Sequence, residues 1–257
     1  MLTNKEIKYY ADLKNKRSRD EEGKFLVEGI HLIKECLSSQ LYYSEQIECI
    51  IARDDFDLSL VPTKDIEIFY ASAKNFDRLS DTVNPQGIIA VVKKPEHSNR
   101  LHNSDKHKLI VALDNINDPG NLGTIIRTCY WFNVDKILIS KNSVDLYNPK
   151  VIRASQGAIF HAEIITEADL RVELLQLKDE CKILLTDLDA KKNLSEYNIK
   201  QDEKYIIVFG NEANGISEEI KNQGFDLIKI DDFTDCESLN LAVSAGIILY
   251  KFKTALK

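Results

Sequence analysis

The sequence predicts an α/β protein with a small N-terminal α/β or α+β domain and a larger C-terminal domain built on a parallel sheet. Two observations lead to this prediction. In the C-terminal part, apolar runs of strand length alternate with helical apolar patterns, which indicates crossover connections between parallel strands. Ahead of it, a polar stretch containing Pro95 is typical of a linker. We therefore expect domains over residues 1–94 and 109–257, joined by a linker over residues 95–108.

The N-terminal domain has elements of both kinds. Residues 24–29 and 47–52 have the composition of short strands, and residues 87–94 that of a buried strand. Residues 30–37 have the apolar spacing of a helix.

The C-terminal domain is expected to contain five strands and five helices. The strands are Leu109–Leu113, Lys136–Ser140, Lys182–Thr186, Tyr205–Phe209 and Leu227–Ile230. The helices are Leu122–Phe132, Pro149–Phe160, Glu167–Lys178, Ser217–Asn222 and Ser238–Phe252. Ligand sites in such sheets lie at the carboxyl ends of the strands, so polar segments that follow strands are the candidates for function.

Composition limits the classes of protein that fit. The hydrophobic content of 44% is enough for a sizeable core, while the net charge of −7 argues against a surface covered with cations. The N-terminal segment still gathers a basic patch, which fits either nucleic-acid contact or a solvated helix face: Lys5, Lys8, Lys14, Lys16, Arg17, Arg19 and Lys24. The sequence has no apolar leader and no run of transmembrane length, so we expect a cytoplasmic protein without membrane contact.

The cysteines give no sign of a metal site. Five of them are scattered along the chain, with no C-x-x-C pair and no histidine at ligand spacing. We expect buried, reduced thiols and no bound metal.

The first candidate segment is "LDNINDPGNLGTIIRT", residues 113–128. Its turn residues precede a helical pattern that carries Arg127, six residues after Asn121. A guanidinium in such a cleft suits phosphate, because its planar fork donates two hydrogen bonds at once, although a plain surface arginine fits as well.

The second candidate segment is "VFGNEANGIS", residues 208–217. Gly210 and Gly215 permit close approach and a tight bend, as in phosphate-binding turns. Glu212 stands where such a turn would need glycine, and its carboxylate would repel a pyrophosphate. The segment therefore favours a neutral or cationic ligand, or an arginine partner such as Arg127.

The third candidate segment is "IKIDDFTDCESLNLAVSAGIILYK", residues 228–251. Ser238 and Asn240 precede an apolar helix with several small residues, which let a helix lie close to a sheet or another subunit. The two polar residues also fit plain roles as a helix N-cap and a turn residue.

Together these segments resemble three motifs of the SpoU (TrmH-type) branch of the SPOUT RNA methyltransferases, over the chain from Leu109 onward. Asn121 and Arg127 match the first motif, and Gly210, Glu212 and Gly215 the second. The third is matched by Ser238, Leu239 and Asn240, but lacks the proline that usually follows its first isoleucine. The sequence "NPKVIRASQGAIF", residues 148–160, is similar to a further family segment.

The resemblance implies a fold and partners that periodicity does not reveal. It implies a deep trefoil knot in the C-terminal domain, a homodimer, and an N-terminal RNA-binding domain of the ribosomal-protein (L30e-like) type. It also implies S-adenosylmethionine as cofactor, held by backbone groups at Gly210, Ile230 and Leu239. The reaction implied is methyl transfer to a ribose 2′-hydroxyl, with ribosomal RNA favoured over tRNA because an added domain extends the RNA footprint.

The same resemblance supplies the candidate catalytic residues Asn121, Arg127, Glu212, Ser238 and Asn240. The family proposal makes the arginine a general base, but a guanidinium stays protonated in proteins, so we expect Arg127 to grip a phosphate and stabilise alkoxide charge. Water or the phosphate is left as the final proton acceptor. Glu212 is expected to pair with Arg127 or with a loop donor.

Two other functions compete with this reading. A noncatalytic RNA-binding or ribosome-assembly protein could share the fold, although the intact motif residues argue against it. A dinucleotide-dependent oxidoreductase fits poorly, because the turn lacks its middle glycine and no suitable ribose-binding acid follows a first strand and turn.

Overall fold

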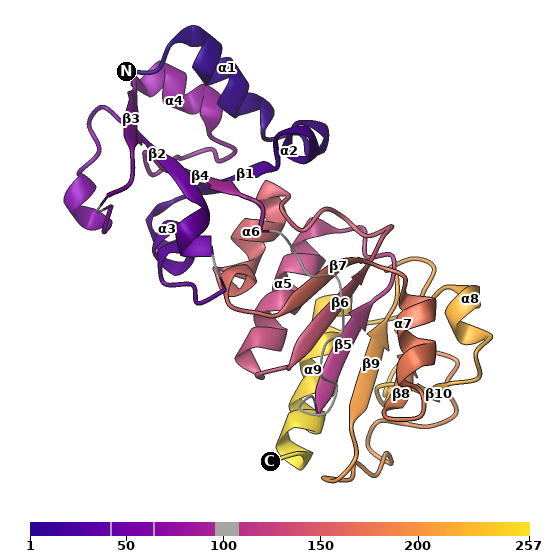
Figure 1. Ribbon diagram of the computed structural model, residues 1–257. Coiled ribbons are helices and arrows are strands. Elements are labelled where there is room, and N and C mark those ends of the chain that lie inside the picture. The colour runs from indigo at the N-terminus through magenta and orange to yellow at the C-terminus, as the bar shows by residue number, and fades with distance from the viewer. Residues whose placement is uncertain (42, 64, 96–107) are drawn as a thin grey trace. The chain divides into compact units, whose positions relative to one another are not determined.

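The computed structural model describes residues 1–257 except residues 42, 64 and 96–107, so most of the predicted linker at 95–108 lies outside the described residues. The chain forms two compact units, drawn in Figure 1. One comprises Met1–Glu96 with Tyr147–His161, and the other His97–Leu146 with Ala162–Lys257.

The first unit is built on a mixed four-stranded sheet in the order β1-β4-β2-β3. Strand β4 pairs antiparallel with β1 and β2, and β2 pairs parallel with β3. The strands are β1 Lys24–Glu28, β2 Ile47–Arg53, β3 Ile68–Ala71 and β4 Ile88–Lys93. The helical elements of residues 1–95 are α1 Asn4–Asp12, α2 Lys16–Glu22, α3 Ile30–Leu37, η1 Tyr43–Gln46, η2 Leu58–Leu60 and α4 Ala73–Leu79.

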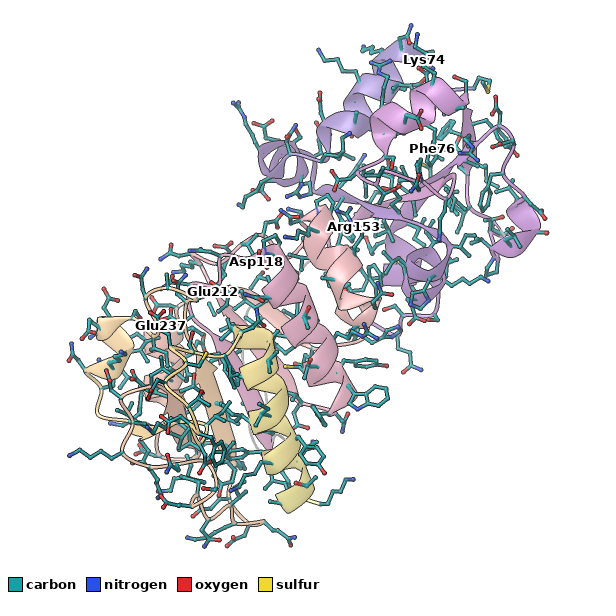
Figure 2. The ribbon with its side chains drawn as sticks, turned by 180° about the vertical axis from the view of Figure 1, so that it is seen from behind. Lys74, Phe76, Asp118, Arg153, Glu212 and Glu237 are labelled. Carbon is teal, nitrogen blue, oxygen red and sulfur yellow. The ribbon has the colours of Figure 1, made fainter. Side chains whose placement is uncertain are left out.

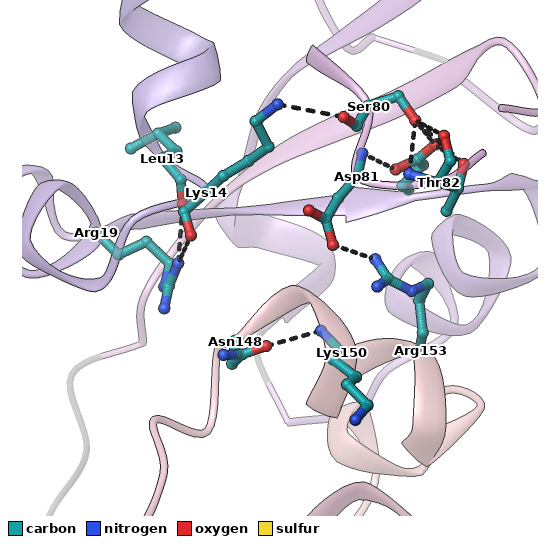
Figure 3. Close-up of polar contacts among 10 residues, drawn as sticks. Leu13, Lys14, Arg19, Ser80, Asp81, Thr82, Asn148, Lys150 and Arg153 are labelled. Carbon is teal, nitrogen blue, oxygen red and sulfur yellow. Dashed lines mark hydrogen bonds and ion pairs between the residues drawn. The ribbon is translucent and has the colours of Figure 1, made fainter. Parts of the chain in front are cut away.

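The segment Tyr147–His161 completes the first unit, with helix α6 at Pro149–Ser155 and the short helix η4 at Ala158–Phe160. The ring of Tyr147 stacks on that of Phe25 at 4.4 Å between centroids. Arg153 Nη1 lies 2.8 Å from Asp81 Oδ2, as Figure 3 shows. The sequence-based division assigns this segment to the C-terminal domain, whereas in the structure it packs with residues of the N-terminal one.

The second unit contains a six-stranded sheet in the order β10-β8-β9-β5-β6-β7, in which every pairing is parallel. The strands are β5 Leu109–Leu113, β6 Lys136–Ser140, β7 Ile164–Ala168, β8 Lys182–Thr186, β9 Tyr205–Phe209 and β10 Asp226–Ile228. This confirms the predicted α/β class with a parallel sheet.

Helices cover both faces of this sheet (Figures 1 and 2). Helices α7 and α8 lie on one face, where Leu174 and Ile220 pack on strand residues such as Ile110. Helices α5 and α9 lie side by side on the other face, where the rings of Phe252 and Tyr205 meet at 5.2 Å. The helices are α5 Pro119–Trp131, α7 Leu170–Leu177, α8 Glu218–Lys221 and α9 Leu241–Ala255.

Several predicted helices have wrong bounds: the helix expected at Leu122–Phe132 begins at Pro119, and the one expected at Ser238–Phe252 begins at Leu241, after the N-cap Asn240. The expected helix Pro149–Phe160 breaks after Ser155, because Gln156 (φ 49°) and Gly157 (φ 90°) adopt left-handed conformations. The expected helix Glu167–Lys178 begins too early, because strand β7, which the pattern did not predict, runs to Ala168.

The basic patch of the N-terminal segment is largely paired. Lys16 and Arg17 form ion pairs with acids one turn later on α2, and Lys24 pairs with Glu48. Arg19 is buried and donates to the carbonyls at the end of α1, those of Leu13 and Lys14. Lys5 and Lys8 of α1 are exposed, so part of the patch remains a cationic surface.

The cysteines are free thiols, of which Cys236 alone is exposed. Burial raises the pKa of Cys36 to about 12 and that of Cys49 to about 11. Across the described residues, no helix is long and apolar enough to cross a membrane.

Candidate active site

Three loops meet at the carboxyl ends of β5 and β9 and at the start of α9. They are the β5–α5 loop (residues 114–118), the β9 turn (residues 210–216) and the α9 lead segment (residues 231–240). Figure 2 shows Asp118 and Glu212 close together at this edge. These segments therefore lie where ligand sites of parallel sheets are expected, at the carboxyl ends of strands.

Glu212 joins the β9 turn to the β5–α5 loop. Its carboxylate accepts hydrogen bonds from the backbone N–H groups of Asn117 and Asp118, both at 3.3 Å. It also accepts one from the side-chain amide of Asn121 at 3.0 Å. Among the described residues, Glu212 thus has partners in the β5–α5 loop and at the start of α5, and no contact with Arg127.

Asn121 and Asn240 connect the first and third segments. The side-chain amide of Asn240 donates to Asn121 Oδ1 at 3.0 Å. The Oδ1 atom of Asn240 caps α9 by accepting from Ala242 and Val243 N–H. Glu212, Asn121 and Asn240 therefore form one hydrogen-bonded chain between residues far apart in sequence.

The β9 turn is held tightly by its own backbone. Asn211 and Gly215 exchange two backbone hydrogen bonds at 2.8 and 2.9 Å. A Cβ on Gly210 would lie 2.2 Å from the carbonyl carbon of Gly215 and 2.3 Å from the nitrogen of Ile216. Glycine is needed at residue 210 because the two arms of the turn touch there.

Arg127 lies on α5, exposed to solvent, and no hydrogen bond or ion pair joins it to another described residue. Helix α5 begins at Pro119, after the N-cap Asp118. Helical geometry separates Arg127 from Asn121 by about 9 Å along the axis and about 120° around it. This separation explains why the arginine does not join the hydrogen-bonded chain.

The α9 lead segment is open. Every residue from 232 to 240 is exposed, including Ser238, whose backbone carbonyl accepts a contact from the Cys236 thiol. Leu239 is 48% exposed and Ile230 is half-buried. Hydrogen bonds from the Ser195 hydroxyl and amide lower the pKa of Asp231 at the start of the segment.

Three polar residues of this edge were not predicted. Asp114 is buried and accepts from Ser217 N–H at 2.8 Å, which ties the end of β5 to the start of α8. Ser140 and Ser143 accept hydrogen bonds from the β5–α5 loop. Each of them lies at or shortly after the end of a buried strand, and that position is the signal that could have identified them.

The donor set around the β9 turn suits a ligand without phosphate. Its polar side chains are Asn211, Glu212 and Asn214, and neither a lysine nor an arginine lies within the turn. Leu239 adds exposed apolar surface. A ligand without phosphate is compatible with these groups, since the Glu212 carboxylate repels anions. Among the described residues, no group of three or more potential ligands is placed to hold a metal ion.

Comparison with known proteins yields two family matches. Residues 108–250 match the SpoU rRNA Methylase family, and residues 4–90 match the MRM3-like substrate binding domain.

Individual relatives cover nearly the whole chain. The chain is 30% identical to the 23S rRNA (guanosine(2553)-2′-O)-methyltransferase RlmP of Bacillus subtilis, over 97% of this chain and 96% of the relative. A solved structure of a TrmH-family protein from Porphyromonas gingivalis is 28% identical, with a TM-score of 0.83 over 98% of each chain. An AdoMet-bound rRNA methyltransferase from Sinorhizobium meliloti has the same fold, at 23% identity and a TM-score of 0.85, over 100% of this chain and 97% of that one.

Proposed function

Because the chain belongs to the SpoU rRNA methylase family, we propose that it is an enzyme that transfers a methyl group from S-adenosylmethionine to a ribose 2′-hydroxyl of ribosomal RNA. The observation that carries this proposal is the Glu212–Asn121–Asn240 chain, which ties three motif segments together. Helix α5, which carries Asn121, also carries Arg127, an arginine with no partner among the described residues. The cofactor supplies an electrophilic methyl group, and Gly210, Ile230 and Leu239 are the residues proposed to hold it.

We propose that residues 1–94 bind the RNA substrate and residues 109–257 carry the methyltransferase activity. The two family matches, over residues 4–90 and 108–250, support this division. The trefoil knot stays a prediction from the resemblance.

Arg127 is proposed to grip an RNA phosphate next to the reacting ribose. Its exposed guanidinium has no partner among the described residues, so it is available to a phosphate. Its charge would also stabilise the alkoxide that develops as the 2′-hydroxyl loses its proton to water or to the phosphate.

The neutral residues are proposed to orient the ribose. Asn121, Ser238 and Asn240 carry groups that donate to or accept from ribose hydroxyls. Glu212 holds the amide of Asn121 and thereby fixes which way that side chain points.

Replacing Arg127 by lysine tests whether methyl transfer needs the two hydrogen bonds that a planar guanidinium donates. We expect Arg127→Lys to lower kcat about a hundredfold while S-adenosylmethionine affinity, measured by calorimetry, stays within twofold. Arg171→Lys, at an exposed arginine of α7, is the matched control and should keep full activity. Retained activity in Arg127→Lys would show that charge alone suffices, and failure of the wild-type protein to bind the cofactor would favour a noncatalytic RNA-binding role.

A homodimer is proposed from the exposed face of α9. Val243, Ile247 and Tyr250 are 51%, 39% and 61% exposed and recur at helical spacing, and Trp131 on the neighbouring α5 is 83% exposed. A second copy packed there would bury this stripe.

Trp131 is the single tryptophan of the chain, so its fluorescence reports on this face. We expect a blue-shifted emission at micromolar concentration, and a red-shifted, monomeric protein for Ile247→Asp in sedimentation experiments. Lys253→Asp, further along α9, serves as the control. A wild-type monomer would exclude the dimer.

The substrate is proposed to be ribosomal RNA, modified in the cytoplasm, with tRNA as the alternative. The Bacillus subtilis relative, named for 23S rRNA, gives the first RNA to test. Mapping of 2′-O-methyl sites in rRNA and tRNA from cells with and without the gene would identify the nucleotide. Loss of a tRNA site alone would overturn the ribosomal assignment.

A further inference from the structure

The β5–α5 loop has all four of its N–H groups at residues 115–118 bonded to side chains of other segments. The first two donate to Ser140 Oγ at 2.8 Å and to Ser143 Oγ at 3.1 Å. The last two donate to the two carboxylate oxygens of Glu212. The loop is thus held from two sides, by the end of β6 and by the β9 turn.

The two serines act as one unit. Their hydroxyl oxygens lie 3.0 Å apart, so one donates to the other while each accepts a loop N–H. Ser143 N–H donates to the carbonyl of Ser140 at 3.1 Å, which closes a turn, and Val144 N–H donates to Ile116 O at 2.8 Å. Ser140 is 9% exposed, so its hydroxyl is fixed within the fold.

The second residue of the loop has an unusual backbone conformation. Asn115 has a φ of 56°, in the left-handed region. Its N–H is held by Ser140, and its carbonyl accepts from the side chain of Asn211 at 2.7 Å. Such backbone conformations persist where the surroundings determine them, and they gather at functional sites.

The loop sets the start of α5. Its last residue, Asp118, caps the helix by accepting from Asn121 N–H at 2.8 Å. Asn121 also donates to Glu212, and Arg127 lies six residues further along the same helix. A shift of the loop therefore moves both proposed active-site residues relative to the β9 turn.

We propose that Ser140 and Ser143 are positioning residues for methyl transfer. Resting on the proposed function, this inference assigns them the task of holding residues 115–118 so that α5 presents Asn121 and Arg127 in the reactive geometry. In this role they would act through the loop and not by touching substrate or cofactor. Glu212 performs the same task from the opposite side of the loop.

The experiment compares Ser143→Ala, which removes the acceptor for Ile116 N–H, with Ser143→Thr, which keeps a hydroxyl. We expect the alanine variant to lose about tenfold in kcat on an rRNA transcript, because misplacement of reacting groups lowers turnover more than binding. KM for RNA and the dissociation constant for S-adenosylmethionine should stay within twofold, and the threonine variant should recover most of the activity. Ser155→Ala, which removes a buried hydroxyl bonded to Ile152 O, is the control with wild-type kcat.

A double-mutant cycle with Glu212→Gln sharpens the result. Since both residues hold the same loop, the loss of kcat in the double variant should be smaller than the product of the two single losses. Wild-type kcat in Ser143→Ala, or equal losses in kcat, RNA affinity and cofactor affinity, would overturn the positioning role alone. Absence of methyl transfer by the wild-type protein would overturn the proposed function and the inference with it.

Discussion

The β5–α5 loop and the α9 lead segment border the same candidate site and differ in how they are held. In the loop, four consecutive N–H groups are bonded to side chains of two other segments. The lead segment is tied near its ends, by Asp231 to Ser195 and by Asn240 to Asn121, and Phe233 between them is 92% exposed. The loop is therefore fixed by contacts within the chain, whereas residues 232–240 are exposed.

The largest effect on stability and cofactor affinity is expected from a substitution at Gly210 in the β9 turn. Gly210→Ala places a Cβ against the backbone of Gly215 and Ile216, so the turn must open. We expect a stability loss of about 1–3 kcal/mol in denaturant unfolding, and S-adenosylmethionine affinity lowered at least tenfold in calorimetry.

The matched control is Gly246→Ala in α9, where the nearest atom to a new Cβ is Thr128 Cγ2 at 4.0 Å. This change should leave stability unaltered or raise it by up to about 1 kcal/mol, because alanine favours helix. A Gly210→Ala protein as stable as Gly246→Ala would contradict the tight turn.

An effect of intermediate size is expected on backbone hydrogen exchange when the cofactor is added. Hydrogen exchange of residues 232–240 should slow about fivefold or more on addition of S-adenosylmethionine, because exposed backbone becomes covered. Exchange of residues 115–118 should change less than twofold, since those N–H groups are already bonded. Mass spectrometry of peptides from both segments measures the exchange rates. In Gly210→Ala, which binds the cofactor weakly, the same concentration of S-adenosylmethionine should leave both rates unchanged. Stronger protection of residues 115–118 than of residues 232–240 would contradict the comparison.

The smallest effect is expected at Asp231. Ser195→Ala removes the hydroxyl that donates to its carboxylate, so the pKa of Asp231 should rise toward its ordinary value. A carboxyl with a lowered folded-state pKa stabilises the protein above its unfolded-state pKa, and the contribution disappears as pH falls through the folded-state pKa. Carbon NMR titration of the Asp231 carboxyl measures its pKa. Thr234→Ala is the control and should leave that pKa unchanged. An unchanged pKa in Ser195→Ala would exclude the hydrogen bond.

The sequence predicts the sheet better than the site. Leu109–Leu113 and Tyr205–Phe209 agree with the structure residue by residue, because central parallel strands are buried on both faces and read as continuous apolar runs. Edge strand β7 has only two apolar residues, Ile164 and Ile165, before Thr166 and Glu167. A run of two apolar residues is too short to show the hydrophobic periodicity of a strand, so the sequence does not predict β7.

Three of the five candidate catalytic residues, Asn121, Glu212 and Asn240, form one hydrogen-bonded chain, but the motifs do not predict these bonds. Glu212 finds its partners more than 90 residues away, and spacing along the chain cannot distinguish those partners from Arg127. Ser140 and Ser143 belong to no periodic pattern, and their role depends on the loop of another strand. Local sequence therefore leaves such tertiary hydrogen bonds undetermined.

The segment Tyr147–His161 limits how domains of this protein and its relatives can be exchanged. The chain passes between the two compact units three times, so a break at residues 96–107 leaves part of the first unit behind. Phe25 stacks on Tyr147 and Tyr43 meets Phe160 edge-on, although more than a hundred residues separate each pair in the chain. A hybrid that exchanges only the N-terminal domain between relatives would divide these aromatic pairs between two parents. Hybrids that transplant Tyr147–His161 together with that domain keep both halves of the packing from one parent.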